Sequence, residues 1–177
     1  MLSAETLAYA KSKIRDIPDF PKPGIMFKDI TPLLASPQAL HEAIHRFVIH
    51  YLPAKVDAIA AAEARGFLIA APLALSLNKP LVPLRKPGKL PYTTHKSQYD
   101  LEYGSAELHV HIDGFKAGDN VLLVDDVLAT GGTMSAAVDL IEKSGAKVQS
   151  IAVLVELTFL GGRERLKRHD VMALLTY

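Results

Sequence analysis

Residues 121–133 contain the strongest local signal in the chain: Val121-Leu122-Leu123-Val124-Asp125-Asp126-Val127-Leu128-Ala129-Thr130-Gly131-Gly132-Thr133. The first four residues of this stretch form a short apolar run typical of a buried strand, and an amphipathic helical pattern follows its last residue. The small residues between them let backbone N–H groups approach an anion, and a helix N-terminus favours negative charge. Thr130 and Thr133 add hydroxyl donors, so the turn at 129–133 is a candidate phosphate site.

The two aspartates before this turn need a different ligand group. Asp125 and Asp126 cannot bind a phosphate directly because like charges repel, but they can accept hydrogen bonds from two vicinal hydroxyl groups. An acid pair beside a phosphate-binding turn therefore describes a site for a ribose 5-phosphate. No Lys-Ser or Lys-Thr closes the turn as in a Walker A loop, and the Gly-x-Gly-x-x-Gly fingerprint is absent. The alternative is an ordinary strand, turn and helix with capping residues.

Strands and helices alternate on both sides of this stretch. Such alternation predicts an α/β fold with a central, mostly parallel sheet flanked by helices, and 177 residues suit a single domain over 1–177. From hydrophobic periodicity and the positions of Pro and Gly, we expect helices at 3–14, 36–51, 66–77 and 133–144, and strands at 56–61, 80–84, 106–112, 121–124, 148–157 and 171–175.

Two segments interrupt this alternation. Pro18, Pro21, Pro23 and Gly24 force a rigid, non-helical stretch. Residues 86–104 have no clear periodicity, and a loop of that length is usually functional or disordered.

Composition excludes several classes of function. Hydrophobic residues make up 49% of the chain and the net charge is +1, which argues against a disordered chain and against a whole-protein field for nucleic acid. The absence of cysteine excludes disulfides, thiolate zinc sites and cysteine nucleophiles. The first residues lack the pattern of a signal peptide, and no apolar run reaches membrane-spanning length. We expect a cytoplasmic protein.

The stretch 121–133 resembles the phosphoribosyl pyrophosphate signature of type I phosphoribosyltransferases, and residues 125–134 look like the adenine-specific branch. This resemblance implies the type I fold, with a small N-terminal helix and hood over 1–35 and a long flexible loop. It implies transfer of the phosphoribosyl group from phosphoribosyl pyrophosphate to adenine, giving AMP and pyrophosphate. The ribose and 5-phosphate would then be bound by Asp125, Asp126, Ala129, Thr130, Gly131, Gly132 and Thr133.

The proline-rich stretch is similar to the family's adenine-binding hood. A backbone stiffened by prolines can hold an aromatic ring in a fixed place, and Phe27 is suited to stack on a purine. The resemblance implies that main-chain groups of Met26 and Lys28 read the edge of the base. By residue type alone, a core aromatic is the favoured explanation of Phe27, and the match of the surrounding residues reverses this.

Two basic segments are similar to the family's pyrophosphate-binding loops. In the segment 63–67, Gly66 allows an unusual backbone and Arg65 can bind a phosphate with two hydrogen bonds. The stretch 85–91 is a basic loop, and a charge cluster of this kind, taken alone, is usually a solvated surface. The resemblance implies a pyrophosphate site formed by Ala64, Arg65, Arg85, Lys86, Lys89 and Tyr103, with the last three from either subunit of a homodimer.

The end of the long loop, 99–104, resembles the family's mobile catalytic loop. The resemblance implies that Glu102 accepts the proton from adenine, although an exposed glutamate without a role is the default for a single Glu. Mg²⁺ would be held by phosphoribosyl pyrophosphate and water rather than by protein ligands. The expected partners are these two small molecules and a second copy of the chain, with no nucleic acid and no membrane.

Three other interpretations stay open. His41-Glu42-Ala43-Ile44-His45 matches the zinc peptidase pattern on an expected helix, but Val48 replaces the metzincin glycine and a third ligand is not evident. A non-catalytic regulator would usually carry an added DNA-binding domain, for which no length is spare. A transferase for another base would differ in the hood, where 20–30 favours adenine.

Overall fold

The computed structural model describes residues 4–20, 22–100 and 105–177, and its Cα positions divide into two compact units, Met1–Ile49 and His50–Tyr177. That residues 1–177 form a single domain stays a prediction. Within the described residues, no helix is long and apolar enough to cross a membrane.

The first unit combines helices with a short antiparallel ribbon. Its elements are α1 (Ala4–Ser12), β1 (Arg15–Pro18), β2 (Met26–Asp29), α2 (Thr31–Leu34) and α3 (Pro37–Tyr51), the last of which continues into the second unit. β1 and β2 are antiparallel and pair with Ile17 opposite Phe27, and Pro18 of the proline-rich stretch lies in β1 opposite Met26. The buried side chains of this unit come mainly from α2 and α3: Leu33, Ala39, Ala43, Ile44 and Phe47.

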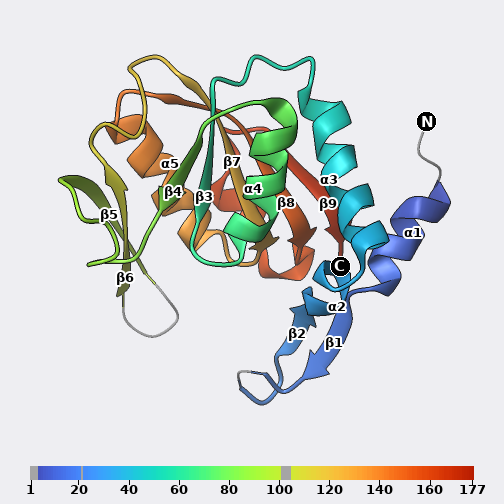
Figure 1. Cartoon of the computed structure of the whole chain (residues 1–177). Coiled ribbons are helices and arrows are strands. Elements are labelled where there is room, and N and C mark those ends of the chain that lie inside the picture. Colours follow the sequence, from blue (N-terminus) through green and yellow to red (C-terminus); the bar gives the residue numbers. More distant parts are fainter. Residues whose placement is uncertain (1–3, 21, 101–104) are drawn as a thin grey trace. The chain divides into compact units, whose positions relative to one another are not determined.

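The second unit is built on a five-stranded parallel sheet in the order β4-β3-β7-β8-β9 (Figure 1). The central strands are buried on both faces, which explains their near-continuous apolar sequences. The strands are β3 (Ala58–Ala62), β4 (Leu81–Leu84), β7 (Asn120–Leu128), β8 (Lys147–Glu156) and β9 (Val171–Thr176). This confirms the expected fold class.

Two longer helices cover this sheet. α4 (Gly66–Leu77) connects β3 to β4, and α5 (Gly132–Lys143) connects β7 to β8. The two crossovers run in opposite directions along the sheet, and crossovers between parallel strands are right-handed as a rule, so the helices lie on opposite faces. Figure 1 shows α4 in front of the strands and α5 behind them.

The strands β1 and β2 and the short helix α2 were not expected from the sequence, and three features of the second unit also differ from the expectations. Residues 94–100 are not loop: β5 (Thr94–Asp100) pairs with β6 (Ser105–His111) in an antiparallel hairpin whose polar residues hid the strand pattern. β7 continues through the aspartates because its ladder with β8 extends to Leu128. A short helical segment, η1 (Thr158–Leu160) and α6 (Gly162–Arg165), follows β8.

A buried hydrogen-bond network joins the start of the second unit to β8. The hydroxyl oxygens of Tyr51 and Ser150 lie 3.0 Å apart, and Ser150 Oγ donates to Asp170 Oδ2 at 3.0 Å. Burial raises the pKa of Tyr51 to about 12, against the opposing effect of the hydrogen bond with Ser150 and with the help of the Asp170 charge. The neutral hydroxyl is therefore the form that the fold stabilises.

Replacing Tyr51 with phenylalanine should remove a component of alkaline unfolding. Because the folded pKa is raised from 10.0 to about 12, the wild type loses on the order of 2–3 kcal/mol of stability as pH rises between these values. Denaturant unfolding at about pH 8 and about pH 11.5 measures this loss. A Tyr51→Phe variant that loses as much stability as the wild type would contradict the assignment.

Candidate active site

The candidate site lies where the connections of the sheet diverge. The chain leaves β3 toward β4 on one side and leaves β7 toward β8 on the other, although β3 and β7 are neighbours. Loops that follow such a pair of strands leave a crevice at their carboxyl ends, where open α/β sheets bind ligands. The loop at 63–65 and the turn at 129–131 both open onto this edge.

The turn after β7 has the backbone of an anion site. Gly131 has φ of 81°, in the left-handed region, and directly precedes the first residue of α5. The first N–H groups of a helix have no partner within the helix, and α5 carries no acidic residue in its first turn. Thr130 is exposed and Thr133 half-buried, so both hydroxyls border the same turn as the backbone donors.

The two aspartates lie in the last part of β7, which ends at Leu128 just before this turn. Asp125 is half-buried and Asp126 is buried, and Arg65 Nε lies 2.8 Å from Asp126 Oδ2. Burial raises the pKa of both carboxyls, and the charge of Asp126 raises that of Asp125 further, whereas Arg65 opposes both shifts. The pair is therefore costly to keep charged unless hydrogen-bond donors reach it, as the hydroxyls of a sugar would.

Gly66 lets the loop after β3 approach these carboxylates. A Cβ at Gly66 would lie 2.7 Å from Asp125 Oδ1 and 3.3 Å from the Val124 carbonyl oxygen. Glycine at the start of α4 thus allows Arg65 and the aspartates to belong to one site.

Arg85 is held at the same edge by two side chains. Its Nε donates to the Glu63 carboxylate, and its guanidinium lies 5.7 Å from the centre of the Phe67 ring. Burial alone would raise the pKa of Glu63, but hydrogen bonds from Arg85 and the Lys86 backbone, with their charges, keep it below its ordinary value. Arg85 therefore faces the loop at 63–65 with a fixed orientation.

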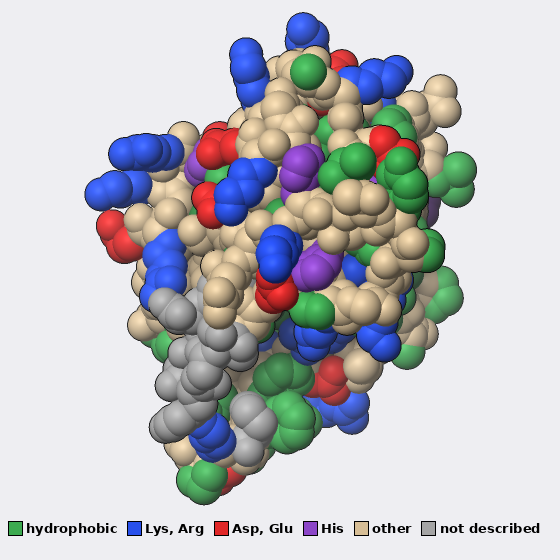
Figure 2. Space-filling model, turned by 90° about the vertical axis from the view of Figure 1, so that its left-hand side faces the viewer, with side chains coloured by type: hydrophobic (Ala, Val, Ile, Leu, Met, Phe, Trp, Pro, Cys, Tyr) green, Lys and Arg blue, Asp and Glu red, His purple; other side chains and the backbone are tan. Residues whose placement is uncertain are grey.

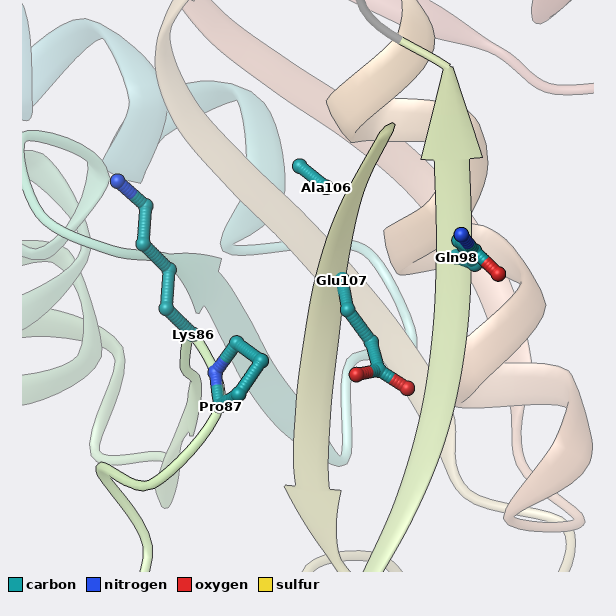
Figure 3. Close-up of a pocket in the computed structure, with 5 residues that line it drawn as sticks. All are labelled: Lys86, Pro87, Gln98, Ala106 and Glu107. Atoms are coloured by element: carbon teal, nitrogen blue, oxygen red, sulfur yellow. The ribbon is translucent and has the colours of Figure 1, made fainter. Parts of the chain in front are cut away.

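The basic loop after β4 borders a hollow of about 500 Å³ beside the hairpin of β5 and β6. Figure 3 shows Lys86 extended away from the hairpin strands that carry Gln98 and Glu107. Lys86 and Lys89 are both exposed, and Arg85 exchanges two backbone hydrogen bonds with His109 of β6. Figure 2, which looks from the side of β5 and β6, shows basic, acidic and histidine side chains close together on this face.

In the first unit, the three expected adenine residues lie together on β2. Met26 is exposed, whereas Phe27 and Lys28 are half-buried. The Phe27 ring meets the Phe20 ring edge-on at 5.1 Å, and Lys28 Nζ lies 2.7 Å from Asp16 Oδ1. The hairpin thus presents an aromatic pair with a fixed geometry.

Several sequence-predicted residues are not brought together by the described structure. Glu102 and Tyr103 lie outside the described residues. The histidines of the zinc peptidase pattern, His41 and His45, are exposed on α3 with stacked rings 5.8 Å apart. In the parts of the chain that the structure describes, no group of three or more His, Cys, Asp or Glu side chains could hold a metal.

Sequence reasoning missed two contacts at the site. The sequence did not predict that Glu63 holds Arg85, whose Nε donates a hydrogen bond to the Glu63 carboxylate. Gly162, about thirty residues after the turn at 129–131, packs directly against the backbone of that turn. Neither contact has a local sequence signal, although Gly161-Gly162 after a buried strand indicates a close backbone approach.

Residues 29–174 match the family described as the phosphoribosyl transferase domain. The chain is 53% identical over 167 residues to the adenine phosphoribosyltransferase of Symbiobacterium thermophilum, covering 94% of this chain and 98% of that one. The solved adenine phosphoribosyltransferase of Thermoanaerobacter pseudethanolicus is similar with a TM-score of 0.94 at 49% identity, covering 97% and 99% of the two chains. That of Saccharomyces cerevisiae, solved with adenine and an imino-altritol bisphosphate, has a TM-score of 0.93 at 37% identity and coverages of 98% and 100%.

Proposed function

Because the chain belongs to the phosphoribosyltransferase family, in its adenine-using branch, we propose that the residues described above make AMP from adenine and phosphoribosyl pyrophosphate. The reaction is purine salvage: adenine displaces pyrophosphate from the ribose. One observation carries the assignment of residues: β7 contains the acid pair, and the glycine turn and the N-terminus of α5 follow β7 where the sheet connections diverge.

The 5-phosphate rests on the turn formed by Ala129, Thr130, Gly131, Gly132 and Thr133. Backbone N–H groups and the α5 dipole stabilise its charge there, and the turn carries no acidic side chain. Asp125 and Asp126 accept hydrogen bonds from the two ribose hydroxyls. The raised pKa values of these carboxyls support this role, because hydroxyl donors replace the water that burial removed.

The departing pyrophosphate is bound by Ala64, Arg65, Arg85, Lys86, Lys89 and Tyr103. An arginine has five N–H donors, so the contact of Arg65 Nε with Asp126 is compatible with phosphate binding through its other nitrogens. Such cationic groups neutralise charge as the C1–O bond breaks, and fixed positions for both ends of the substrate supply much of the acceleration. Glu102 accepts the proton that adenine loses.

Mg²⁺ suits this site as a companion of the substrate. Mg²⁺ prefers oxygen ligands, retains water and binds substrate phosphates more often than protein cages. Asp125 and Asp126 would hold the ribose beside such an ion without being its direct ligands, and the ion would be held by the substrate and water. When bound, the ion would neutralise charge on the pyrophosphate.

The function is tested by offering the protein four bases with phosphoribosyl pyrophosphate and Mg²⁺. Nucleotide and pyrophosphate are measured with adenine, hypoxanthine, guanine and xanthine in turn. AMP from adenine alone, abolished by EDTA, is the expected result. Equal rates with hypoxanthine or guanine, or no product from folded protein, would contradict the proposal.

Met26, Phe27 and Lys28 hold adenine, the ring of Phe27 by stacking and the other two through their main chains. Replacing Phe27 with leucine should raise KM for adenine by about 10-fold, since a stacked base contributes on the order of 1–3 kcal/mol. Steady-state rates with either substrate varied measure this. KM for phosphoribosyl pyrophosphate should change less than about 2-fold, and an unchanged adenine KM would contradict stacking.

The chain forms a homodimer through the outer face of α4. Leu68, Ala71, Pro72 and Leu75 share one helical stripe, and Leu75 is 84% exposed. Apolar stripes of this kind on a folded surface mark protein contacts. The same helix begins at the pyrophosphate loop, so a partner on this face lies close to the substrate.

Replacing Leu75 with glutamate should therefore dissociate the dimer, because a charge would be buried without a partner. Light scattering should give a mass near twice 19.2 kDa for the wild type and near 19.2 kDa for the variant. Ile49→Glu is the control, since Ile49 is an exposed apolar residue on another helix. A variant that stays dimeric would contradict this interface.

A further inference from the structure

The phosphate turn is supported from behind by a second backbone segment. Gly162, the first residue of α6, is buried against the turn, and a Cβ there would overlap the Ala129 carbonyl oxygen and lie 3.0 Å from the Gly131 nitrogen. The contact is reciprocal, since a Cβ at Gly131 would lie 2.6 Å from the Gly162 carbonyl oxygen. The two segments of the chain therefore cross with backbone against backbone at Gly131 and Gly162.

One arginine fixes this second segment to the sheet. Arg163 Nε and Nη2 donate to the two carboxylate oxygens of Glu156 at 2.9 and 2.5 Å, and Nη1 donates to the Val171 carbonyl oxygen at 2.8 Å. Glu156 is 4% exposed and ends β8, and Val171 begins β9. The hydrogen bond and charge of Glu156 raise the pKa of Arg163 against the opposing effect of burial, so the guanidinium stays charged.

We propose that Gly162 and Arg163 are positioning residues for the 5-phosphate site, with Gly162 setting the backbone of the turn at 129–132 and Arg163 fixing Gly162. The inference rests on the proposed role of that turn. Neither residue touches the substrate. Their effect passes through the directions of the backbone N–H groups, which depend on Gly131 keeping its left-handed conformation.

The physical reason is that hydrogen bonds to a phosphate depend steeply on distance and angle. A turn of small residues has no side chains to hold its own shape, and glycine adopts many conformations equally well. Direct contact with an immobilised neighbour removes that freedom before the substrate arrives. Misplacement by about 1 Å far from the reacting bond can cost 100-fold in rate.

The first test replaces Gly161 and Gly162 with alanine, one at a time. Gly162→Ala forces a Cβ into the turn. In Gly161→Ala the new Cβ meets no atom within 4 Å, but the alanine is strained because position 161 has φ of 64°. KM for phosphoribosyl pyrophosphate should rise at least about 10-fold in Gly162→Ala, with KM for adenine within about 2-fold. Equal effects of the two variants would overturn the proposal.

The second test leaves the turn's own contacts intact. Arg163→Met removes the hydrogen bonds to Glu156 and Val171, and Arg163→Lys keeps the charge without the two-pronged geometry. Both should raise KM for phosphoribosyl pyrophosphate and weaken binding of ribose 5-phosphate by about 10-fold, with the methionine variant affected more. Arg165→Met is the matched control, an exposed arginine of the same short helix for which the described residues provide no ion pair.

Circular dichroism and thermal unfolding confirm that each variant is folded at the assay temperature. A loss of stability without a selective change in KM for phosphoribosyl pyrophosphate would mean that Arg163 is only structural, and would overturn the proposal. Thr133→Ala separates the positioning role of Gly162 and Arg163 from the proposed phosphate-binding role of the turn. If it raises that KM while the Gly162 and Arg163 variants do not, the positioning role is wrong and the proposed function stands. If Thr133→Ala also has no effect, the turn is not the phosphate site.

Discussion

Replacing Gly131 with alanine is expected to raise KM for phosphoribosyl pyrophosphate by on the order of 100-fold. Two costs coincide at this position. Its φ of 81° lies in the left-handed region, where a Cβ costs about 1–2 kcal/mol. That Cβ would also lie 2.6 Å from the Gly162 carbonyl oxygen, which belongs to a backbone that cannot move aside cheaply. The turn would have to open, and its N–H groups would leave the phosphate.

The matched control for this variant is Gly118→Ala. Gly118 has a similar φ of 85°, but a Cβ there meets no atom within 4 Å. This control should lower stability by about 1 kcal/mol and leave both KM values within about 2-fold. Initial rates with each substrate varied, together with denaturant unfolding, measure the two effects. Similar KM values for the two variants would contradict the assigned role of the turn.

Replacing Asp125 with asparagine is expected to change activity and stability in opposite directions. Loss of a charge-assisted hydrogen bond to a ribose hydroxyl should lower kcat/KM for phosphoribosyl pyrophosphate by about 10- to 100-fold. Burial and the charge of Asp126 raise the pKa of Asp125, so its charged form destabilises the fold. That penalty is absent at acid pH and grows as pH rises through the raised pKa.

The Asp125→Asn variant should therefore be more stable than the wild type at neutral pH. This advantage should disappear as the solution is acidified below the raised pKa of Asp125. The asparagine oxygen can still accept the Asp126 N–H, which now lies 2.9 Å from Asp125 Oδ1. Denaturant unfolding across pH measures the difference. A variant that is less stable at neutral pH and equally active would contradict both parts of the prediction.

The parts of the fold that could be predicted are those with local signals. Helix α4 begins and ends where the sequence predicted, because Gly66 follows a buried strand and its apolar residues have helical spacing. The turn at 129–131 and the start of α5 were predicted for a similar reason, since glycines directly precede an amphipathic helix. Periodicity and glycine position are properties of neighbours in sequence, and they need no knowledge of the rest of the chain.

The parts that could not be predicted depend on distant partners. The polar strand β5 forms because β6 pairs with it and because Ser97 packs on α5, with its Oγ 3.3 Å from Asp139 Oδ2. The extension of β7 through Asp125 and Asp126 comes from the ladder with β8. The contact of Gly162 with the phosphate turn likewise joins residues thirty positions apart. Residue type alone cannot identify such partners.

The most direct test of the site is a crystal structure of the protein with AMP. We expect the phosphate on the turn at 129–133, with its oxygens about 3 Å from the backbone nitrogens, and the ribose hydroxyls beside Asp125 and Asp126. Adenine should stack on Phe27. A phosphate bound instead at Lys86 and Lys89, with the ribose turned away from the two aspartates, would contradict the account.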